Sequence, residues 1–452
     1  MLSIKILIYL FIKASHKLCK EAILFQYNCK KFLYICVYVI KYKMLKYHIR
    51  RCFMLGRKKI EWVSNYMPLL NYIQETYKGV FDGVKIAMGI HLEAKTAYLA
   101  ITLKKLGAKV FVTGCNPLST QDDVAEALEE FGIIVHAKRT NDEGVYFKNL
   151  NKILDYEPDL ILDDGADLSV IVHTKRKELL KNLKGISEET TTGVRRLKNL
   201  EENKLLSVPA IAVNNAKMKH LFDNRYGTGQ STWDSIMRNT NILIAGKNIV
   251  VAGYGWCGRG IALRAKALGA NVIITEVDPI KALEALMDGY RVMKMSEAAK
   301  IADIIVTSTG MKDVVKFEDI LAMKDGIILA NAGHFNVEIP VKEIEKHADK
   351  IFDARNNVKG YVINGKKVFV IGEGRLVNLA AADGHPIEIM DISFALQTLS
   401  LIYLKENYEK LENKVYDYPE SLDIKVASLK LKSLGIDIDK LSEEQKEYLK
   451  GF

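Results

Sequence analysis

Three ionisable side chains stand close together in HLEAKTA, residues 91–97, directly after the apolar run KIAMGI at 85–90. The run is typical of a buried β-strand, and the residues after it are typical of a helix. His91, Glu93 and Lys95 are therefore expected where a strand gives way to a helix. An imidazole transfers protons near neutral pH, while a carboxylate accepts and an ammonium donates hydrogen bonds. We expect these three groups to face a ligand.

A second chemical feature is the glycine loop GYGWCG, which lies between an apolar run and a helical stretch. Gly253, Gly255 and Gly258 form a G-x-G-x-x-G motif, whose glycines allow a tight turn against a pyrophosphate at a helix N-terminus. Glu276 ends the next predicted strand, 21 residues after Gly255. A carboxylate there accepts from both ribose hydroxyls and repels a 2′-phosphate. The loop therefore predicts NAD rather than NADP; the alternative is a glycine-rich turn in a structural α/β domain.

These groups require a framework of strands and helices, which the sequence supplies in two series. Runs rich in valine and isoleucine, separated by helical stretches, are predicted strands at 85–90, 109–114, 132–138, 159–165 and 210–215, and then at 248–255, 271–278, 302–310 and 326–334. The alternation predicts an α/β fold with two doubly wound parallel sheets. We assign one sheet to a substrate domain and the other to a Rossmann NAD domain, followed by a small helical C-terminal tail.

The C-terminal part of the chain shows three further patterns. Asn364-Gly365 in YVINGKKVFVI predicts a hairpin with a tight turn. Residues 388–411 predict one long amphipathic helix, and the tail is charged and mostly helical. The predicted division of the chain is an N-terminal extension at 1–53, a substrate-binding domain at 54–225 completed by 386–418, an NAD-binding domain at 226–385, and a tail at 419–452.

Composition sets the broad class of the protein. The 452 residues are 27% charged and 49% hydrophobic, which is ordinary for a globular protein of two or three domains. The formal charge is +10, but residues 1–53 hold 11 lysines and arginines against one acid, so residues 54–452 are balanced. Charge therefore gives no reason to expect a nucleic-acid partner. Cys115 and Cys257 are too few for a disulfide framework or a zinc cluster, so we expect no metal and a reduced, cytoplasmic setting.

The first 53 residues lack glycine, proline and aspartate and hold four of the six cysteines. Their apolar runs, ILIYLFI and FLYICVYVI, are far shorter than the ~20 residues that a membrane helix needs. No small-residue cleavage site accompanies them. We expect this segment to lie outside the functional fold, with Met54 as the true start and no membrane partner. The alternative is a basic segment that binds a membrane surface.

Longer stretches, from about residue 56 to about residue 450, resemble the S-adenosylhomocysteine hydrolase family. They include CNPLSTQDD (115–123), LDDGADL (162–168), GISEETTTGV (185–194), FDNRYGTGQS (222–231), VVAGYGWCGRG (250–260), GHFNVEI (333–339), EGRLVNL (373–379) and GHP (384–386), in the family's order. The resemblance implies a homotetramer or homodimer with one tightly bound NAD per subunit. It also implies hydrolysis of an S-nucleosyl-L-homocysteine to a nucleoside and L-homocysteine. In that reaction the ribose 3′-hydroxyl is oxidised to a ketone, C4′ loses a proton, homocysteine leaves C5′, water adds, and the ketone is reduced again.

The resemblance implies roles for residues at the 3′ side of the ribose. Lys219 and Asp223 match the pair beside the 3′-oxygen, where a lysine accepts a proton if its pKa is lowered. Glu189 matches the carboxylate that holds the ribose hydroxyls.

At the 4′ and 5′ positions the resemblance implies a second group. Asp164 matches the carboxylate that removes the C4′ proton; the alternative is a simple Asp163-Asp164 turn. His91 and His334 match histidines near C5′, suited to activating water and protonating the leaving group. A lone buried histidine can instead be a satisfied core residue.

Further family positions hold the substrate and the cofactor. His385 matches the histidine of a mobile Gly-His-Pro element over the substrate. The other substrate-binding positions are Glu93, Lys95, Asp383, Asn214 and Thr120. Besides Glu276 and the three glycines of the loop, the cofactor-binding positions are Thr190, Thr191, Thr192, Asn224, Asn331, Asn378 and Lys281. The threonines could instead serve a strand or a helix cap.

Three positions on the purine side depart from the family. Where the family has a threonine and a glutamate that recognise adenine N1 and its 6-amino group, this chain has Glu93 and Lys95, and Asp383 replaces a methionine. An acceptor at N1 and a donor at C6 fit hypoxanthine, which presents an N1–H and a 6-carbonyl. We therefore predict S-inosyl-L-homocysteine as the preferred substrate, with Asp383 steadying Lys95 or sharing the N1–H.

Several alternatives stay open at this stage. Glu93 and Lys95 could point to solvent or pair with neighbours, and the substrate would then be S-adenosyl-L-homocysteine. A generic NAD-dependent dehydrogenase of a 2-hydroxy acid would share the two-domain plan but would release NADH. An NAD-binding homologue without activity is the non-enzyme alternative.

Overall fold

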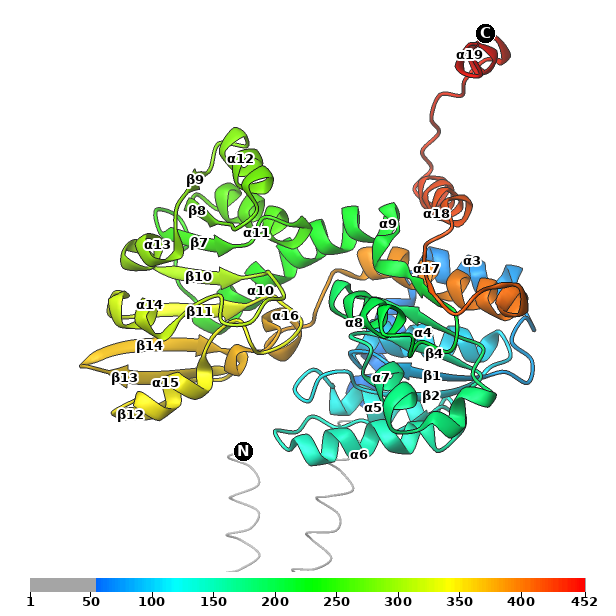
Figure 1. Ribbon diagram of the computed structural model, residues 1–452, viewed down its shortest axis with the longest axis horizontal. Coiled ribbons are helices and arrows are strands. Elements are labelled where there is room, and N and C mark those ends of the chain that lie inside the picture. Colours follow the sequence, from blue (N-terminus) through cyan, green and yellow to red (C-terminus); the bar gives the residue numbers. More distant parts are fainter. Residues whose placement is uncertain (1–53, 452) are drawn as a thin grey trace, which may run out of the picture. The chain divides into compact units, whose positions relative to one another are not determined.

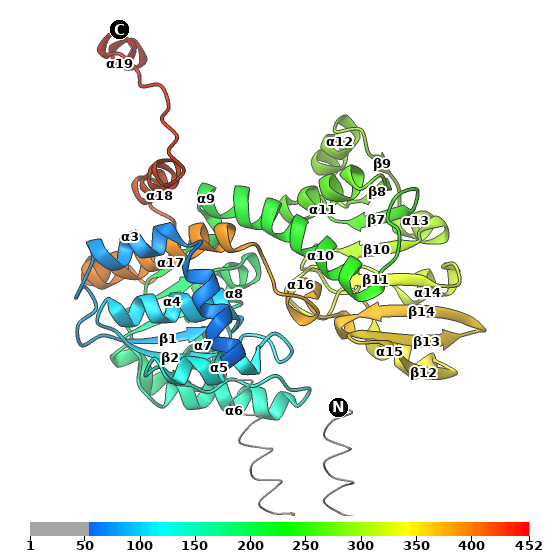
Figure 2. The same ribbon diagram turned by 180° about the vertical axis from the view of Figure 1, so that it is seen from behind.

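The computed structural model describes residues 54–451, so the predictions for residues 1–53 lie outside the described residues. Gly56–Phe452 forms one compact unit. It contains two sheets with helices packed on both faces of each, as Figures 1 and 2 show. The predicted α/β fold with two doubly wound sheets is confirmed.

The first sheet has seven parallel strands in the order β15-β6-β5-β4-β1-β2-β3. Its strands are β1 (Lys85–Gly89), β2 (Lys109–Thr113), β3 (Ile134–Val135), β4 (Leu160–Asp163), β5 (Gly185–Glu188), β6 (Ala210–Ala212) and β15 (Val415–Asp417). Five of these were predicted; β5 and β15 were not. The predicted strand at 132–138 shrinks to the two residues of β3.

The second sheet has eight strands in the order β12-β13-β14-β11-β10-β7-β8-β9. Its strands are β7 (Asn248–Ala252), β8 (Asn271–Thr275), β9 (Arg291–Val292), β10 (Ile304–Thr307), β11 (Ile327–Asn331), β12 (Lys350–Arg355), β13 (Val358–Ile363) and β14 (Lys366–Ile371). The pairs β12–β13 and β13–β14 are antiparallel and the others are parallel. Asn364 and Gly365 both have positive φ, 50° and 76°, in the turn between β13 and β14. The predicted hairpin is therefore confirmed, because a two-residue turn of this kind requires positive φ at both positions.

Helices connect and cover the strands. They are α3 (Pro68–Thr76), α4 (Ala94–Lys105), α5 (Asp122–Glu129), α6 (Glu143–Leu154), α7 (Asp167–Thr174), α8 (Thr191–Glu202), α9 (Lys217–Lys219), α10 (Thr228–Thr240), α11 (Trp256–Ala267), α12 (Pro279–Met287), α13 (Met295–Ile301), α14 (Phe317–Ala322), α15 (Val341–His347), α16 (Val377–Ala380), α17 (Ile387–Asn407), α18 (Glu420–Ser433) and α19 (Glu443–Leu449). A π-helical segment, η3 (His220–Gly227), joins α9 to α10, and short 3-10 turns fill several connections. The last two helices agree with the predicted helical tail.

Each sheet has a hydrophobic core on each of its two faces, and successive side chains of a strand belong alternately to one core and the other. In β1, Ile86 and Met88 belong to one core, whereas Ala87 belongs to the core on the opposite face. In β7, Ile249 and Val250 are divided in the same way. Because side chains in a strand point alternately to opposite faces, apolar residues at every position bury the sheet on both sides. The continuous valine and isoleucine runs of the sequence have this cause.

The long helix predicted at 388–411 is present as α17, but the prediction that it is amphipathic was wrong. Buried residues occur all round α17, because it is enclosed by the first sheet and by α3, α4 and α18. By length and hydropathy alone, the segment Ile387–Lys410 could cross a membrane, yet 78% of its apolar window is buried inside the protein. A helix that is apolar all round belongs either in a membrane or in a core, and this one packs in a core.

Candidate active site

A cavity of about 1150 Å³ lies where strands of both sheets end. Its wall includes residues that directly follow β1, β4, β5, β7, β8 and β11, all at their carboxyl ends. Ligands of open α/β sheets bind at this edge. The cavity wall contains every predicted site residue except Thr120, Gly258, Asn331 and Asp383. The cavity therefore brings together most of the predicted site residues.

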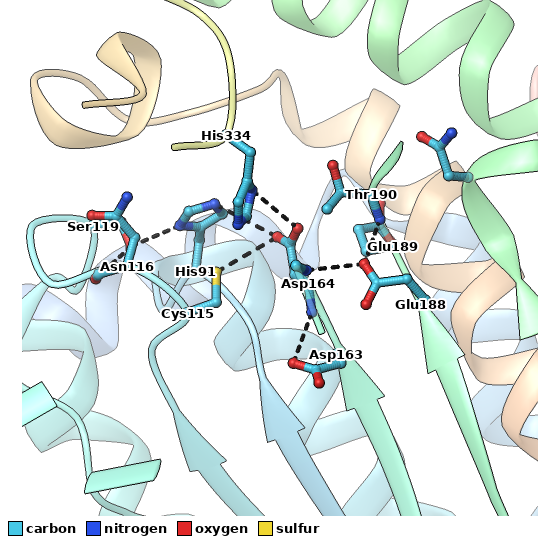
Figure 3. A network of polar contacts seen from close by, with 12 residues as sticks. His91, Cys115, Asn116, Ser119, Asp163, Asp164, Glu188, Glu189, Thr190 and His334 are labelled. Carbon is cyan, nitrogen blue, oxygen red and sulfur yellow. Dashed lines mark hydrogen bonds and ion pairs between the residues drawn. The ribbon is translucent and has the colours of Figure 1, made fainter. Parts of the chain in front are cut away.

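Two histidine rings that line the cavity flank one carboxylate, as Figure 3 shows. Asp164 follows β4, and its Oδ2 lies 3.6 Å from His91 Nε2, while its Oδ1 lies 3.7 Å from His334 Nδ1. Cys115 Sγ lies 3.7 Å from the same Oδ2. All four side chains are buried. The alternative of a simple turn at Asp163-Asp164 does not explain a buried carboxylate that lies beside two histidine rings and a thiol.

The hydrogen bonds of His91 determine which ring nitrogen faces the cavity. Its Nδ1 lies 2.7 Å from Ser119 Oγ, which in turn donates to the Asn116 carbonyl at 3.1 Å. Since that hydroxyl proton is used, Nδ1 donates and Nε2 carries the free lone pair. Burial lowers the pKa of His91 to about 4, against the opposing effect of Asp164. The ring is therefore neutral near pH 7, and Nε2 is an available proton acceptor.

Two more buried carboxyls lie beneath Asp164. Asp163 accepts from the Ser169 amide and hydroxyl at 2.8 and 2.7 Å, and Glu188 accepts from the Gly165 and Thr190 amides at 2.9 and 2.8 Å. Burial raises the pKa of Asp163 to about 7 and raises that of Glu188 well above its ordinary value. These carboxyls were not predicted as site residues, and they fix the loop that presents Asp164.

The π-helical segment η3 brings a second polar cluster together. Lys219 Nζ lies 2.9 Å from Asp223 Oδ1, 2.9 Å from Asn224 Oδ1 and 3.3 Å from Glu189 Oε1. The wider π turn places residues four and five positions after Lys219 beside one ammonium, a geometry that recurs at functional sites. Asn224 Nδ2 then donates to Asn214 Oδ1 at 3.1 Å. The predicted pairing of Lys219 with Asp223 is present.

The condition under which Lys219 would accept a proton, a lowered pKa, is not met among the described residues. Burial by itself would lower the pKa of Lys219, but the neighbouring Asp223 and Glu189 carboxylates raise it above its usual value. The pKa of Asp223 is in turn lowered, because Lys219 and His385 outweigh its burial. Burial raises the pKa of Glu189 to about 8, against the stabilising effect of Lys219. Lys219 is thus an ammonium held between two carboxyls.

His385 connects this cluster to the segment before α17. Its Nδ1 lies 3.4 Å from Asp223 Oδ1, and its Nε2 lies 3.2 Å from Thr228 Oγ1. The ring packs against Gly227, where an added Cβ would come within 3.0 Å of the imidazole. The Gly-His-Pro element therefore closes directly over the Lys219 cluster.

Glu93 and Lys95 form a buried ion pair at the cavity wall. Lys95 Nζ lies 2.6 Å from Glu93 Oε2, and the two residues are only 4% and 5% exposed. Glu93 is also the N-cap of α4, since its carboxylate accepts from the Lys95 and Thr96 amides. The alternative in which both side chains point to solvent is wrong, whereas pairing with a neighbour is observed, with each as the other's partner.

The prediction for the Asp383 side chain was wrong in part. Its carboxylate lies 2.8 Å from Arg238 Nη1, outside the cavity wall, and is 66% exposed. The backbone carbonyl of Asp383 instead accepts from Lys95 Nζ at 2.8 Å. Asp383 therefore steadies Lys95 through its main chain, and the ion pair with Arg238 holds its carboxylate outside the cavity wall.

The second sheet supplies a wall suited to a dinucleotide. Gly253 and Gly255 line the cavity at the end of β7, and Glu276 lines it beyond β8. Gly258 lies outside the wall; a Cβ there would come within 1.9 Å of the Gly253 carbonyl oxygen, so this glycine permits close packing of helix on strand. Glu276 accepts from the Tyr254 amide at 2.6 Å, which fixes the carboxylate beside the loop.

Asn378 and the threonines of α8 face the same space. Asn378 Nδ2 donates to Ser231 Oγ at 2.9 Å, but its buried Oδ1 has no partner among the described residues. A buried acceptor without a donor indicates a ligand that supplies one. Thr190 makes no side-chain cap bond to α8, so the cap alternative is wrong for it. The residues present therefore fit the predicted NAD, with an amide acceptor and free hydroxyls on one wall.

Three predicted residues have other surroundings. Asn331 is fully buried and its side chain holds the loop before His334, donating to the Gly333, Phe335 and Gly374 carbonyls. It therefore supports that loop, and its role as a cofactor contact stays a prediction. Thr120 is buried outside the wall. Lys281 lines the cavity at its exposed rim, 3.5 Å from Asp278.

Some polar residues around the site were missed by the sequence analysis. Ser119 orients His91, and Ser393 and Gln397 of α17 donate to Asp223 and Glu189. Ser119 lies in CNPLSTQDD, so that stretch carried a signal. Ser393 and Gln397 carried no such signal, because a single polar residue in an apolar run does not show which side chain it contacts in the fold.

The arrangement supports proton transfer at two places in one cavity. An ammonium between carboxyls stands at one place, and a carboxylate between two rings stands at the other. Ligand atoms of His91, Asp164 and His334 also lie within 4.8 Å of one another, which are ligand types that can hold a metal ion. The expectation of no metal stays a prediction.

Comparison with known proteins agrees with this geometry. The family descriptions "S-adenosyl-L-homocysteine hydrolase" and "S-adenosyl-L-homocysteine hydrolase, NAD binding domain" match residues 46–180 and 224–384. "Adenosylhomocysteinase" of Thermotoga maritima is 65% identical over 400 residues, covering 88% of this chain and 99% of that protein. "S-inosyl-L-homocysteine hydrolase" of Methanocaldococcus jannaschii and its namesake of Methanococcus maripaludis are each 57% identical over 396 residues, covering 87% of this chain and 95% of those proteins. With both halves matched and its NAD-binding wall in place, the chain belongs to the S-adenosyl-L-homocysteine hydrolase family.

Proposed function

We propose that this protein hydrolyses an S-nucleosyl-L-homocysteine to a nucleoside and L-homocysteine, and that its preferred substrate is S-inosyl-L-homocysteine. One observation carries the reaction type: the Asp164 carboxylate between two buried histidines shares a cavity with the Lys219 cluster and the glycine loop. A redox-neutral cleavage at a ribose needs proton transfer at an oxygen and at a carbon, with a cofactor beside them. The proposal gives each of these tasks to a separate group.

NAD, when bound, supplies reversible oxidation at the 3′ carbon of the ribose. The glycine loop and Glu276 would hold its adenosine half, and Asn378 with the Thr190–Thr192 hydroxyls would hold its nicotinamide half. The unpartnered Asn378 Oδ1 is placed to accept from a carboxamide. The family's NAD-binding description over residues 224–384 supports this assignment.

Lys219, Asp223 and Glu189 are proposed to work at the 3′ side. Glu189 accepts a hydrogen bond from a ribose hydroxyl. The Lys219 ammonium donates a hydrogen bond to the 3′-oxygen when that oxygen is negatively charged. The proton of the 3′-hydroxyl passes to one of the two carboxylates that contact Lys219 rather than into water. His385 covers this group from the Gly-His-Pro element.

Asp164 is proposed to remove the C4′ proton, and the flanking rings to act at C5′. His91 is neutral and presents Nε2, so it can accept a proton from an attacking water. His334 lies on the other oxygen of Asp164 and is suited to protonate the leaving thiolate. Burial keeps other water away from the ketone intermediate.

The ion pair at the head of α4 is proposed to recognise the purine edge. Of the three N–H groups of the Lys95 ammonium, one meets Glu93 and one meets the Asp383 carbonyl, which leaves one donor. Glu93 Oε1 makes only long contacts, 3.3 and 3.4 Å, to Thr96 and can accept. A donor beside an acceptor matches the 6-carbonyl and N1–H of hypoxanthine.

The test is kcat/KM for S-inosyl- and S-adenosyl-L-homocysteine on purified protein loaded with NAD. We expect the inosyl form to be favoured by roughly 10²-fold or more, because a mismatched buried donor or acceptor is strongly rejected. Equal efficiency, or preference for the adenosyl form, would contradict the substrate assignment while leaving the reaction type intact. Steady release of NADH without homocysteine would contradict the reaction type and indicate a dehydrogenase.

The double variant Glu93→Thr with Lys95→Glu should shift the preference towards the adenosyl substrate. Threonine is itself a good N-cap, so α4 keeps its first turn. Lys105→Glu is the matched control, since it reverses a charge on the exposed end of the same helix. If the control shifts the preference as far as the double variant does, the effect is one of net charge and the recognition hypothesis fails.

S-adenosyl-L-homocysteine is the second candidate substrate. It is favoured by the 65% identity to a relative whose name is adenosylhomocysteinase. The same substrate comparison decides between the two. A homotetramer or homodimer stays a prediction. A reduced cytoplasm also stays a prediction, and the free thiols of Cys115 and Cys257 among the described residues support the reduced setting.

A further inference from the structure

A line of polar side chains runs along one face of the buried helix α17. Ser393, Gln397 and Ser400 are spaced four and three residues apart and are all completely buried. Residues at this spacing share a helix face. Their neighbours on α17 are almost all apolar, so this face is an exception that needs partners.

The first partner is Glu189, which follows β5. Gln397 Nε2 donates to Glu189 Oε2 at 2.6 Å. The opposite end of the Gln397 amide accepts from the Ser187 hydroxyl, which lies 2.9 Å from Ser400 Oγ. Because a hydroxyl fixes the carbonyl end, the amide can present only its N–H₂ to the carboxylate.

The second partner is Asp223, in the π-helical segment. Ser393 Oγ donates to Asp223 Oδ2 at 2.7 Å, while Lys219 bonds the other oxygen. Hydrogen bonds from α17 therefore reach both carboxylates that surround the Lys219 ammonium. Glu189 Oε1 is left without a hydrogen-bond partner among the described residues and faces the cavity.

We propose that Ser393 and Gln397 are positioning residues, which orient Asp223 and Glu189 from behind and favour the ionised form of each carboxylate. The inference rests on the proposed function of that cluster. A donor hydrogen bond favours the charged form of a carboxylate and opposes the effect of burial. It also leaves Glu189 Oε1 as the oxygen that meets the ribose.

This assignment gives α17 a second task. The helix begins directly after His385 and Pro386, so one continuous segment carries the ring that covers Asp223 and the two donors that hold the carboxylates. The start of α17 therefore both places the Gly-His-Pro element over Asp223 and aligns the two carboxylates.

The test uses Gln397→Met and Ser393→Ala in the full-length protein loaded with NAD, with kcat/KM followed against pH. The charged groups that face Glu189 are Lys219, Asp223 and Asp164. Loss of the Gln397 donor should move the acid limb of the profile to higher pH by about one unit, with kcat/KM near neutral pH reduced roughly tenfold. Ser393→Ala should give a smaller shift, because Lys219 and His385 still favour the Asp223 carboxylate.

Thr398→Val is the matched control, since this equally buried hydroxyl on α17 donates only to the Phe394 carbonyl of its own helix. We expect the acid limb of its pH profile to lie at the same pH as in wild type. If the acid limb of the Gln397→Met profile lies at the same pH as in wild type and only the melting temperature falls, the inference is overturned and Gln397 has a merely structural role. Wild-type protein that cleaves neither S-nucleosylhomocysteine would instead overturn the proposed function, so the two failures are distinct.

Discussion

The two polar clusters of the cavity differ in how completely their atoms are bonded. Lys219 contacts Asp223, Asn224 and Glu189, and Ser393 bonds Asp223 from behind. In the other cluster, the Nε2 atoms of His91 and His334 have no hydrogen-bond partner among the described residues. One cluster is thus nearly saturated and the other is open.

This difference separates two requirements of a proton-transfer site. A saturated network of charges fixes geometry, but removing one member leaves another charge buried and unpaired. Open ring nitrogens hold their place by packing and a single bond, as His91 does through Ser119. Damage to the saturated cluster should therefore destabilise the fold near neutral pH, whereas damage to the open cluster should reduce turnover more than stability at that pH.

The largest expected effect is on turnover in Asp164→Asn. The amide keeps the shape but cannot accept the C4′ proton, so kcat should fall roughly 10³-fold with little change in unfolding free energy. Loss of solvent-deuterium exchange at C4′, measured by NMR, locates the defect. Glu188→Gln is the control, because that buried carboxyl has a strongly raised pKa and its amide mimics the neutral form. Comparable losses in both variants would contradict the role of Asp164.

The saturated cluster should respond to Lys219→Met by losing stability as well as activity. Removal of the ammonium leaves Asp223 and Glu189 buried together, which should cost about 3–5 kcal/mol in urea unfolding. Lys217→Met is the control, because its ion pair with Glu420 is 71% exposed on each side and contributes little. Adding Glu189→Gln to Lys219→Met should restore part of the loss. If Lys219→Met unfolds like the control, the saturated cluster has no structural role.

The fold was predictable from sequence where the physical cause was burial. Apolar runs gave most strands of both sheets, and Asn364-Gly365 gave the hairpin. The strand β5 was missed because its sequence, GISE, carries a serine and a glutamate in place of an apolar run. Ser187 is buried there because it meets the polar face of α17, more than 200 residues away in sequence. A pattern within one segment cannot show such a partner.

The sequence motifs predicted which residues line the site, but they did not predict the protonation states of those residues. Glu93, Lys95 and Lys219 were all placed at the cavity by sequence. The pKa of Lys219 depends on the distances to two carboxyls, and the orientation of Asp383 depends on the reach of Arg238. Neither distance follows from spacing along the chain.

The open cluster should reveal itself in the pH dependence of stability. The pKa of His91 is about 4 in the folded protein and near its ordinary 6.5 when unfolded. Between those values the unfolded chain binds more protons, so stability falls as pH falls, by up to roughly 3 kcal/mol. His91→Gln should remove this contribution, so that its stability relative to wild type rises from pH 7 to pH 4. The exposed His347→Gln is the control, and a parallel rise there would refute the assignment to His91.

The smallest effect is expected from Ser119→Ala. The variant removes the single bond that holds His91 Nδ1, so the neutral ring can adopt either tautomer and only one of them presents a free Nε2. A hydrogen bond of this kind contributes about 1 kcal/mol. We therefore expect kcat/KM to fall roughly fivefold and the unfolding free energy to fall by about 1 kcal/mol. The same truncation at Ser433, which bonds only the carbonyl of Lys430 on α18, should leave kcat/KM unchanged. A loss of several kcal/mol in Ser119→Ala would mean that the open cluster is as tightly braced as the saturated one, and the contrast between them would fail.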